Sequence, residues 1–191
     1  MSLVVVKIGL VGNTGIGKTS FLNHIINNNI MKVYNYNQPT IGVDFNIKSF
    51  IYKKDKNELN IQWNIYDTAG QERFSPIIRP YYRLCNIIIL GFSDEESYNN
   101  LDFWLDQIKD NNDKCKIFLV RFKKDLLSLK IPTRSSNNLE GFDIYNISVK
   151  NDEGINELIN IINEYIYENQ DKMIKRENLD IEKKFLKSKC C

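Results

Sequence analysis

Residues 12–19 read GNTGIGKT and lie between a β-branched run and a stretch with apolar residues at helical spacing. The run over residues 3–11 predicts a buried strand, and the spacing over residues 18–30 predicts a helix. A glycine-rich loop between a strand and a helix matches the phosphate-binding pattern. Such a loop turns backbone N–H groups and a helix N-terminus toward phosphates, and its lysine bridges the terminal phosphates. The stretch therefore predicts a site for a nucleoside triphosphate with Mg²⁺.

Beyond this loop, strands and helices alternate. Apolar and polar residues alternate over 45–50 and 59–65, on either side of a polar turn, which predicts an antiparallel hairpin. The other expected elements are strands over 87–92, 116–120 and 143–148, a helix within 94–110, and a last helix capped near Asp152. This order predicts an α/β fold of the phosphate-loop NTPase type. It has a mostly parallel six-stranded sheet with one antiparallel hairpin, helices on both faces, and a ligand site at the carboxyl ends of the strands.

The composition is that of one globular domain. The chain has 191 residues, of which 42% are hydrophobic and 26% charged, and its formal net charge of +2 gives no signature of nucleic-acid binding. After residue 170 the apolar period is lost and lysine becomes frequent, so we expect a folded domain over 1–170 and a flexible basic tail over 171–191. Four cysteines form neither a disulfide framework nor a metal spacing, and no apolar run reaches the roughly 18 residues of a membrane span. A reducing, intracellular setting fits these features.

A second stretch, DTAGQE over residues 67–72, follows the second strand of the hairpin. Asp67 is placed to hold Mg²⁺ through water, Gly70 to offer its N–H to a γ-phosphate, and Gln71 to orient an attacking water. Together with the phosphate loop, this stretch resembles the Ras superfamily of small GTPases. The resemblance implies an enzyme that hydrolyses GTP to GDP and phosphate, with Gln71 as the catalytic residue. It also implies a slow intrinsic rate and activation in trans.

Further stretches resemble the Rab family within that superfamily. They are TIGVDF at 40–45, QERF at 71–74, YYR at 81–83, and the terminal pair Cys190-Cys191. The resemblance covers about residues 3–167 plus that pair. It implies a monomeric switch that regulates vesicle-mediated membrane trafficking, in which Thr40 binds Mg²⁺ and the γ-phosphate only in the GTP state. Tyr81 and Tyr82 are expected on the switch surface, and Trp104 in the core.

The guanine pocket departs from the family pattern. Residues 122–125 read FKKD where small GTPases usually carry Asn-Lys-x-Asp. Asp125 and Lys123 still match the residues that pair with and cover the base, but Phe122 replaces the asparagine. A lost hydrogen bond costs about 0.5–1.5 kcal/mol, so on sequence alone Phe122→Asn is expected to tighten GDP and GTP. Two alternatives are a pseudo-GTPase scaffold with weakened nucleotide binding and, disfavoured by Asp125 and by residues 67–71, a phosphate-loop ATPase or kinase.

The resemblance also assigns the remaining contacts. Residues 148–150, SVK, resemble the loop that backs the base, and an aromatic residue of the first switch, Tyr34 or Tyr36, flanks it. The expected magnesium ligands are Thr19, Thr40 and Asp67. The expected nucleotide contacts are Asn13, Thr14, Gly15, Ile16, Gly17, Lys18, Thr19, Ser20, Tyr34, Thr40, Gly70, Lys123, Asp125, Ser148, Val149 and Lys150.

The tail predicts a lipid anchor. Terminal paired cysteines in Rab proteins carry two geranylgeranyl chains, so Cys190 and Cys191 are the expected lipidation sites. Two chains give stable anchoring, and the lysines before them add about 1 kcal/mol each at an anionic surface. The resemblance therefore implies a lipoprotein on the cytoplasmic face of an intracellular membrane, with a cytosolic pool. The partners it implies are an exchange factor, a GTPase-activating protein, effectors, a prenyl escort and a solubilising inhibitor.

Overall fold

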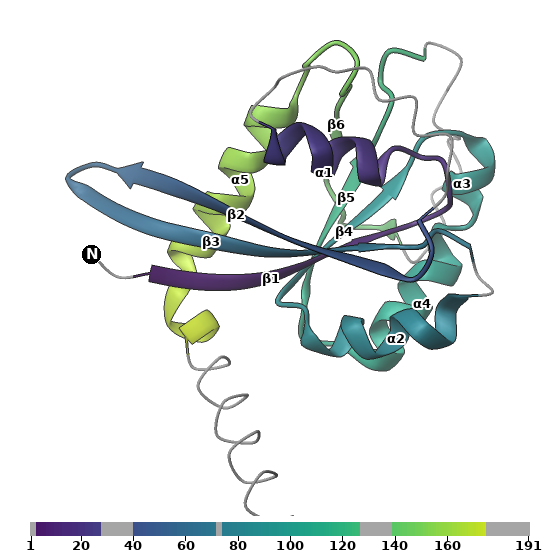
Figure 1. The fold of residues 1–191 in the computed structure, drawn as a ribbon, viewed down its shortest axis with the longest axis horizontal. Coiled ribbons are helices and arrows are strands. Elements are labelled where there is room, and N and C mark those ends of the chain that lie inside the picture. Colours follow the sequence, from purple (N-terminus) through teal and green to yellow (C-terminus); the bar gives the residue numbers. More distant parts are fainter. Residues whose placement is uncertain (1–2, 28–39, 72–73, 127–138, 175–191) are drawn as a thin grey trace, which may run out of the picture.

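A six-stranded sheet in the order β2-β3-β1-β4-β5-β6 forms the centre of the molecule (Figure 1). The computed structural model describes residues 3–27, 40–71, 74–126 and 139–174. The strands are β1 Leu3–Val11, β2 Val43–Lys54, β3 Asn57–Thr68, β4 Ile87–Phe92, β5 Lys116–Arg121 and β6 Ile144–Asn146. Neighbouring strands run parallel except β2 and β3, which pair antiparallel along their whole length. The predicted sheet and hairpin are thus confirmed.

Helices cover both faces of this sheet, as predicted (Figure 1). They are α1 Lys18–Ile26, α2 Ser75–Leu84, α3 Glu95–Asn99, α4 Leu101–Asn111 and α5 Ile155–Glu168. One apolar core joins α1 and α5 to the sheet. A second core lies on the other face, beneath α2 and α4. Among the described helices, none is long and apolar enough to cross a bilayer.

Three local features differ from the sequence-based expectations. The helix expected within 94–110 is two helices, because α3 ends at Asn99 and α4 begins at Leu101. Helix α5, expected to be capped near Asp152, has Gly154 as its N-cap, and the φ of 72° at that position suits glycine. Helix α2 was not expected at all, because prolines at positions 76 and 80 mask its apolar spacing.

The helical part of the chain continues beyond the expected domain boundary at residue 170. Residues 170–174 are helical, and the buried side chain of Met173 belongs to the core beneath α1 and α5. The packed domain therefore reaches residue 174. The rest of the tail lies outside the described residues.

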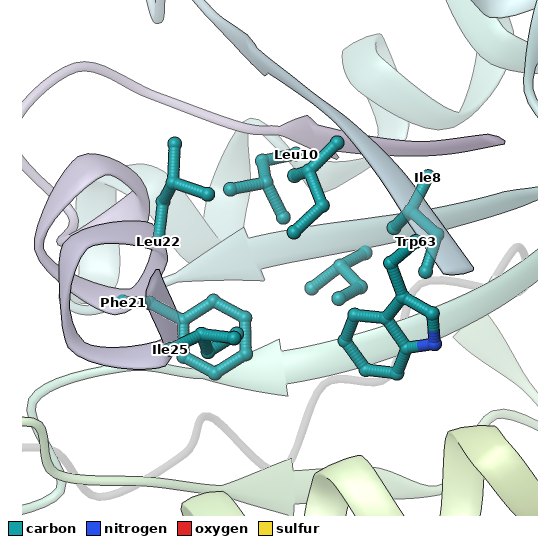
Figure 2. A pocket seen from close by; sticks show the side chains of 8 residues that line it. Ile8, Leu10, Phe21, Leu22, Ile25 and Trp63 are labelled. Atoms are coloured by element: carbon teal, nitrogen blue, oxygen red, sulfur yellow. The ribbon is translucent and has the colours of Figure 1, made fainter. Parts of the chain in front are cut away.

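The core beneath α1 fixes the position of that helix. Figure 2 shows Phe21, Leu22 and Ile25 of α1 facing Ile8 and Leu10 of β1 and Trp63 of β3. Ile65 and Ile89 complete this apolar lining, which leaves no room for a water molecule. Interiors of this density transmit strain and hold their side chains in place. The loop that enters α1 is therefore held by a rigid helix and is not a free-standing turn.

Candidate functional site

The loop between β1 and α1 has the geometry of a phosphate cradle. Gly17 caps α1 with a φ of 116°, a backbone conformation open to glycine and strained for other residues. Lys18 is 5% exposed, and its Nζ donates to the carbonyl oxygens of Gly12 and Asn13, each at 2.7 Å. Burial lowers the pKa of Lys18 to about 8, although the nearby Asp67 opposes this shift. An anion placed beside Lys18 would restore its preference for the charged form.

Two hydroxyls and one carboxylate meet beside this loop. Thr19 Oγ1 donates to Asp67 Oδ2 at 2.6 Å and lies 3.1 Å from Thr40 Oγ1. The Thr40 hydroxyl also lies 3.4 Å from the same carboxylate oxygen. The three residues come from α1, from the segment before β2, and from the end of β3. The fold thus brings together all three residues expected to hold magnesium.

The chemistry of this cluster fits Mg²⁺. Hydroxyl and carboxylate oxygens are the ligands that this hard cation prefers. Burial raises the pKa of Asp67, although hydrogen bonds from Thr19 and Thr40 and the charge of Lys18 work against it. The second carboxylate oxygen, Oδ1, is buried with no hydrogen-bond partner among the described residues. A divalent cation would satisfy that oxygen and favour the ionised carboxylate.

The segment that follows Asp67 packs against the phosphate loop. A methyl group on Gly70 would overlap the Thr14 backbone nitrogen and lie 2.6 Å from the Asn13 carbonyl oxygen, so only glycine fits there. The Ala69 N–H donates to the Gly42 carbonyl at 2.8 Å, which extends the hairpin ladder toward the site. The side-chain oxygen of Gln71 is buried and accepts no hydrogen bond within the described chain. The backbone at Gly70 therefore lies against the phosphate loop, and this contact fixes the positions of residues 70 and 71.

A hydrogen bond from helix α4 also reaches the phosphate loop. Trp104 is 2% exposed, as expected for a core residue, and its indole N–H donates to Asn13 Oδ1 at 2.7 Å. The Asn13 backbone in turn accepts from Lys18 and packs against Gly70. Sequence reasoning missed this contact, because the two residues are 91 positions apart and no local pattern links them. The one available signal for this contact was Trp104 itself, because a buried indole N–H usually finds a hydrogen-bond acceptor.

The two loops expected to form the base pocket also come together. Ser148 is fully buried, and its hydroxyl donates to Asp125 Oδ1 at 2.7 Å. The Lys124 N–H donates to the Ile147 carbonyl at 2.9 Å, which joins the loop after β5 to the loop after β6. Lys123 has a φ of 55°, which is uncommon for a residue with a side chain. This pair of loops lies at the carboxyl ends of β5 and β6, where the expected ligand site is.

The remaining expected contacts differ in exposure. Thr14, Gly15, Ser20 and Lys150 are exposed, Val149 is half-buried, and Ile16 is buried. The side chain of Ile16 therefore packs inward, and only its backbone can face a ligand. Tyr34, Tyr36, Cys190 and Cys191 lie outside the described residues. The choice between the two tyrosines stays open.

The tyrosine pair divides between surface and core. Tyr81 is half-buried, and its ring lies tilted against that of Tyr66 with 5.5 Å between centroids; the Tyr66 ring in turn lies 5.3 Å from that of Phe45. Tyr82 is fully buried, so its expected place on the switch surface was wrong. Neighbouring residues on a helix point in different directions, and here α2 turns the second tyrosine toward β4. Phe45, Tyr66 and Tyr81 form an aromatic row that runs from β2 across β3 to α2.

A phosphate cradle, a hydroxyl and carboxylate cluster, and a sheet covered on both faces are together the features of a phosphate-loop nucleotide-binding protein. A sequence model of the family described as "Ras of Complex, Roc, domain of DAPkinase" matches residues 7–125. Ras-related protein Rab-3A of Homo sapiens is 32% identical over 176 residues, which cover 86% of this chain and 77% of the relative. Ras-related protein SEC4 of Saccharomyces cerevisiae is 31% identical over 173 residues, covering 87% and 77%. Rab-3B of Rattus norvegicus is 34% identical over 151 residues, covering 75% and 66%.

The chain belongs to the Rab family of small GTPases. It is therefore a small GTPase enzyme, which converts GTP and water to GDP and phosphate.

Proposed function

We propose that this protein is a GTP-dependent switch that regulates vesicle-mediated membrane trafficking. The observation that carries the proposal is the contact of Thr40 with Thr19 and Asp67. This contact ties the segment before β2 to the phosphate loop at the place where Mg²⁺ and a γ-phosphate would lie. A ligand that makes or breaks the contact changes the conformation of that segment, which is how a nucleotide switch signals.

The proposed hydrolysis uses the residues of this site in distinct roles. Backbone N–H groups of the phosphate loop and the Lys18 ammonium bind the phosphates, and Gly70 donates its N–H to the γ-phosphate. Gln71 orients the water for in-line attack on the γ-phosphorus. Thr19, Thr40 and Asp67 would hold Mg²⁺, which neutralises charge that develops on the phosphate oxygens. No arginine occurs between residues 28 and 44 to assist in cis, so the intrinsic rate is slow and a GTPase-activating protein supplies help in trans.

Guanine recognition is proposed for the two loops joined by Ser148 and Asp125. The Asp125 carboxylate pairs with the N–H donors of guanine, and the Lys123 stem covers the ring. Ser148 donates to Asp125 and fixes its orientation. Val149, Lys150 and the flanking tyrosine at position 34 or 36 complete this pocket in the proposal. Adenine has a hydrogen-bond acceptor where guanine has one of these N–H donors, so the Asp125 carboxylate, which only accepts, does not pair with it.

The nucleotide that copurifies with the full chain tests this function against its rivals. We expect stoichiometric GDP or GTP after expression in bacteria and gentle purification, measured by chromatography of the denatured protein. Excess EDTA should release much of it, because the proposed magnesium ligands no longer share a cation with the phosphates. Bound ATP would favour an ATPase or kinase. A protein that is purified without nucleotide and also fails to bind added GDP would favour the hypothesis of a pseudo-GTPase scaffold.

Membrane attachment through the C-terminus is the second part of the proposal. Cys190 and Cys191 are proposed to carry two geranylgeranyl chains, on the resemblance of the terminal pair to that of Rab proteins. A double chain places the protein on the cytoplasmic face of an endomembrane, with a soluble pool held by a prenyl escort and a solubilising inhibitor. Exchange factors and effectors are proposed to act on the membrane-bound form. The aromatic row of Phe45, Tyr66 and Tyr81 is the surface that we propose for effector contact.

Replacing both terminal cysteines by serine is expected to move the protein from the membrane fraction to the cytosol of a eukaryotic cell. The physical reason is the loss of about 0.8 kcal/mol for each CH₂ group that no longer enters the bilayer. Fractionation by ultracentrifugation measures the change, with a Lys56→Ser variant as a control for expression. Retention of the double variant on membranes would show a different anchor.

A further inference from the structure

Phe122 lies beneath the phosphate loop and not at the rim of the base pocket. Its side chain is 1% exposed, and its ring meets Phe21 of α1 edge-on, with 5.8 Å between centroids. Its backbone N–H donates to the Phe92 carbonyl at 2.8 Å, which extends the pairing of β4 and β5. The position of a missing polar residue is thus occupied by a side chain of the apolar core that also contains Ile16.

The phosphate loop lies next to the Phe122 side chain. Added to Gly17, a Cβ atom would stand 3.6 Å from Phe122 Cβ and 3.8 Å from Cδ1, which is van der Waals contact. Gly17 is the residue that caps α1, and its carbonyl accepts the first helical hydrogen bond from Phe21 at 2.9 Å. Phe122 and Phe21 therefore flank Gly17, the residue at which the loop turns into α1.

A second residue makes room for the ring. Strand β4 reads IIILGF, and its one glycine, Gly91, pairs with Val120 of β5 two residues before Phe122. A methyl group at Gly91 would overlap Phe122 Cε2 and would lie 2.8 Å from Cδ2 and 2.9 Å from Ile16 Cδ1. The space that a side chain at position 91 would fill is thus taken by Phe122. A side chain at position 91 and the ring of Phe122 would therefore occupy the same space.

We propose that Phe122 is a positioning residue that holds the phosphate loop by apolar packing, with Gly91 as its complementary partner. This inference rests on the proposed nucleotide switch and concerns how tightly it retains GDP. A preorganised loop spares the ligand the cost of ordering it, so loss of the support should appear as faster nucleotide release. An asparagine at position 122 would leave a void above Gly91 and a buried amide without a partner built for it. We therefore expect Phe122→Asn to weaken GDP binding, the opposite of the expectation from sequence alone.

Dissociation of a fluorescent GDP analogue from the full chain, loaded with Mg²⁺, tests this pairing. Phe122→Asn should raise the dissociation rate at least about tenfold, which corresponds to about 1.4 kcal/mol. Gly91→Ala should raise it as well, because its methyl group displaces the ring. The double variant Gly91→Ala with Phe122→Leu should release GDP more slowly than Gly91→Ala alone, since leucine vacates the space that the methyl group needs. Phe122→Leu alone keeps the site apolar and should fold.

Phe118→Leu is the matched control. Phe118 is 3% exposed, lies on β5 in the same core, and contacts the rings of Tyr145 and Tyr165 away from the phosphate loop. The Phe118→Leu variant should lower the free energy of unfolding about as much as Phe122→Leu does, but its rate of GDP release should equal that of the parent protein. Equal acceleration of GDP release by Phe118→Leu and Phe122→Leu would overturn the inference. So would GDP release from Phe122→Asn that is slower than from the parent protein. A parent protein that binds no guanine nucleotide would contradict the proposed function instead. In that case the pairing is tested by stability alone: the changes in unfolding free energy caused by the substitutions at positions 91 and 122 should not add in the double variant. Additive changes would overturn the pairing.

Discussion

Lys18→Ala is expected to weaken binding of both GDP and GTP at least about a hundredfold. The ammonium is 5% exposed and is held against the Gly12 and Asn13 carbonyls, where phosphate oxygens would become its further partners. Hydrogen bonds to charged groups contribute about 1.5–3 kcal/mol each, and every 1.4 kcal/mol is tenfold in affinity. Equilibrium titration with a fluorescent GDP analogue measures the loss. Lys56→Ala, which removes an exposed lysine from the turn of the hairpin, is the control for net charge.

The same lysine predicts a pH dependence. Its pKa in the ligand-free site is about 8, and neighbouring phosphates raise it because they favour the charged form. Binding therefore takes up a proton above pH 8, so GDP affinity should fall as the pH rises from 8 toward 10. Well below pH 8 the lysine is already charged in the free protein, and GDP affinity should show little of this slope. Lys18→Ala should lose the slope; a slope that persists in the variant would assign the titration to another group.

Gln71→Leu is expected to slow GTP hydrolysis about a hundredfold, the scale of misplacing one reacting group. Affinity for GTP should stay nearly unchanged, because Gln71 is assigned to the water and not to the nucleotide. Its side-chain oxygen is buried without a hydrogen-bond partner in the described chain, so an ordered water is a suitable partner for it. Single-turnover release of phosphate measures the rate. Gln62→Leu makes the same change on β3 outside the site, and an equal loss there would remove Gln71 from the mechanism.

Local patterns predicted the parts of the site that depend on neighbouring residues. The glycines and lysine of residues 12–19 specify a turn and a helix start within one short segment, so the phosphate loop was predictable. Period-two alternation specified the hairpin and with it the position of Asp67 at a strand end. Once those elements were placed, the parallel sheet brought Thr19 and Asp67 to one edge.

Contacts between distant segments were not predictable in the same way. The bond from Trp104 to Asn13 and the fit of Phe122 over Gly91 depend on the packing of side chains from separate elements. Tyr82 was misplaced because the repeated tyrosine suggested one shared surface, whereas a helix directs adjacent residues to different sides. No pattern in the sequence indicates that a side chain at position 91 and the ring at position 122 would occupy the same space.

The hairpin limits how the segments before β2 and after β3 can move. Thr40 and Gly42 precede β2, and Asp67 and Ala69 lie at or just after the end of β3. Both proposed switch segments therefore begin at the open end of one β-ribbon. The closed end is anchored to α5 by Lys54, whose Nζ lies 2.9 Å from Glu164 and 3.1 Å from Glu168. Sliding the strands by one residue would turn the fully buried Trp63 to solvent. Loss of the γ-phosphate is therefore expected to fray the ribbon from its open end and not to shift its register by one residue, which would keep the structural change close to the nucleotide.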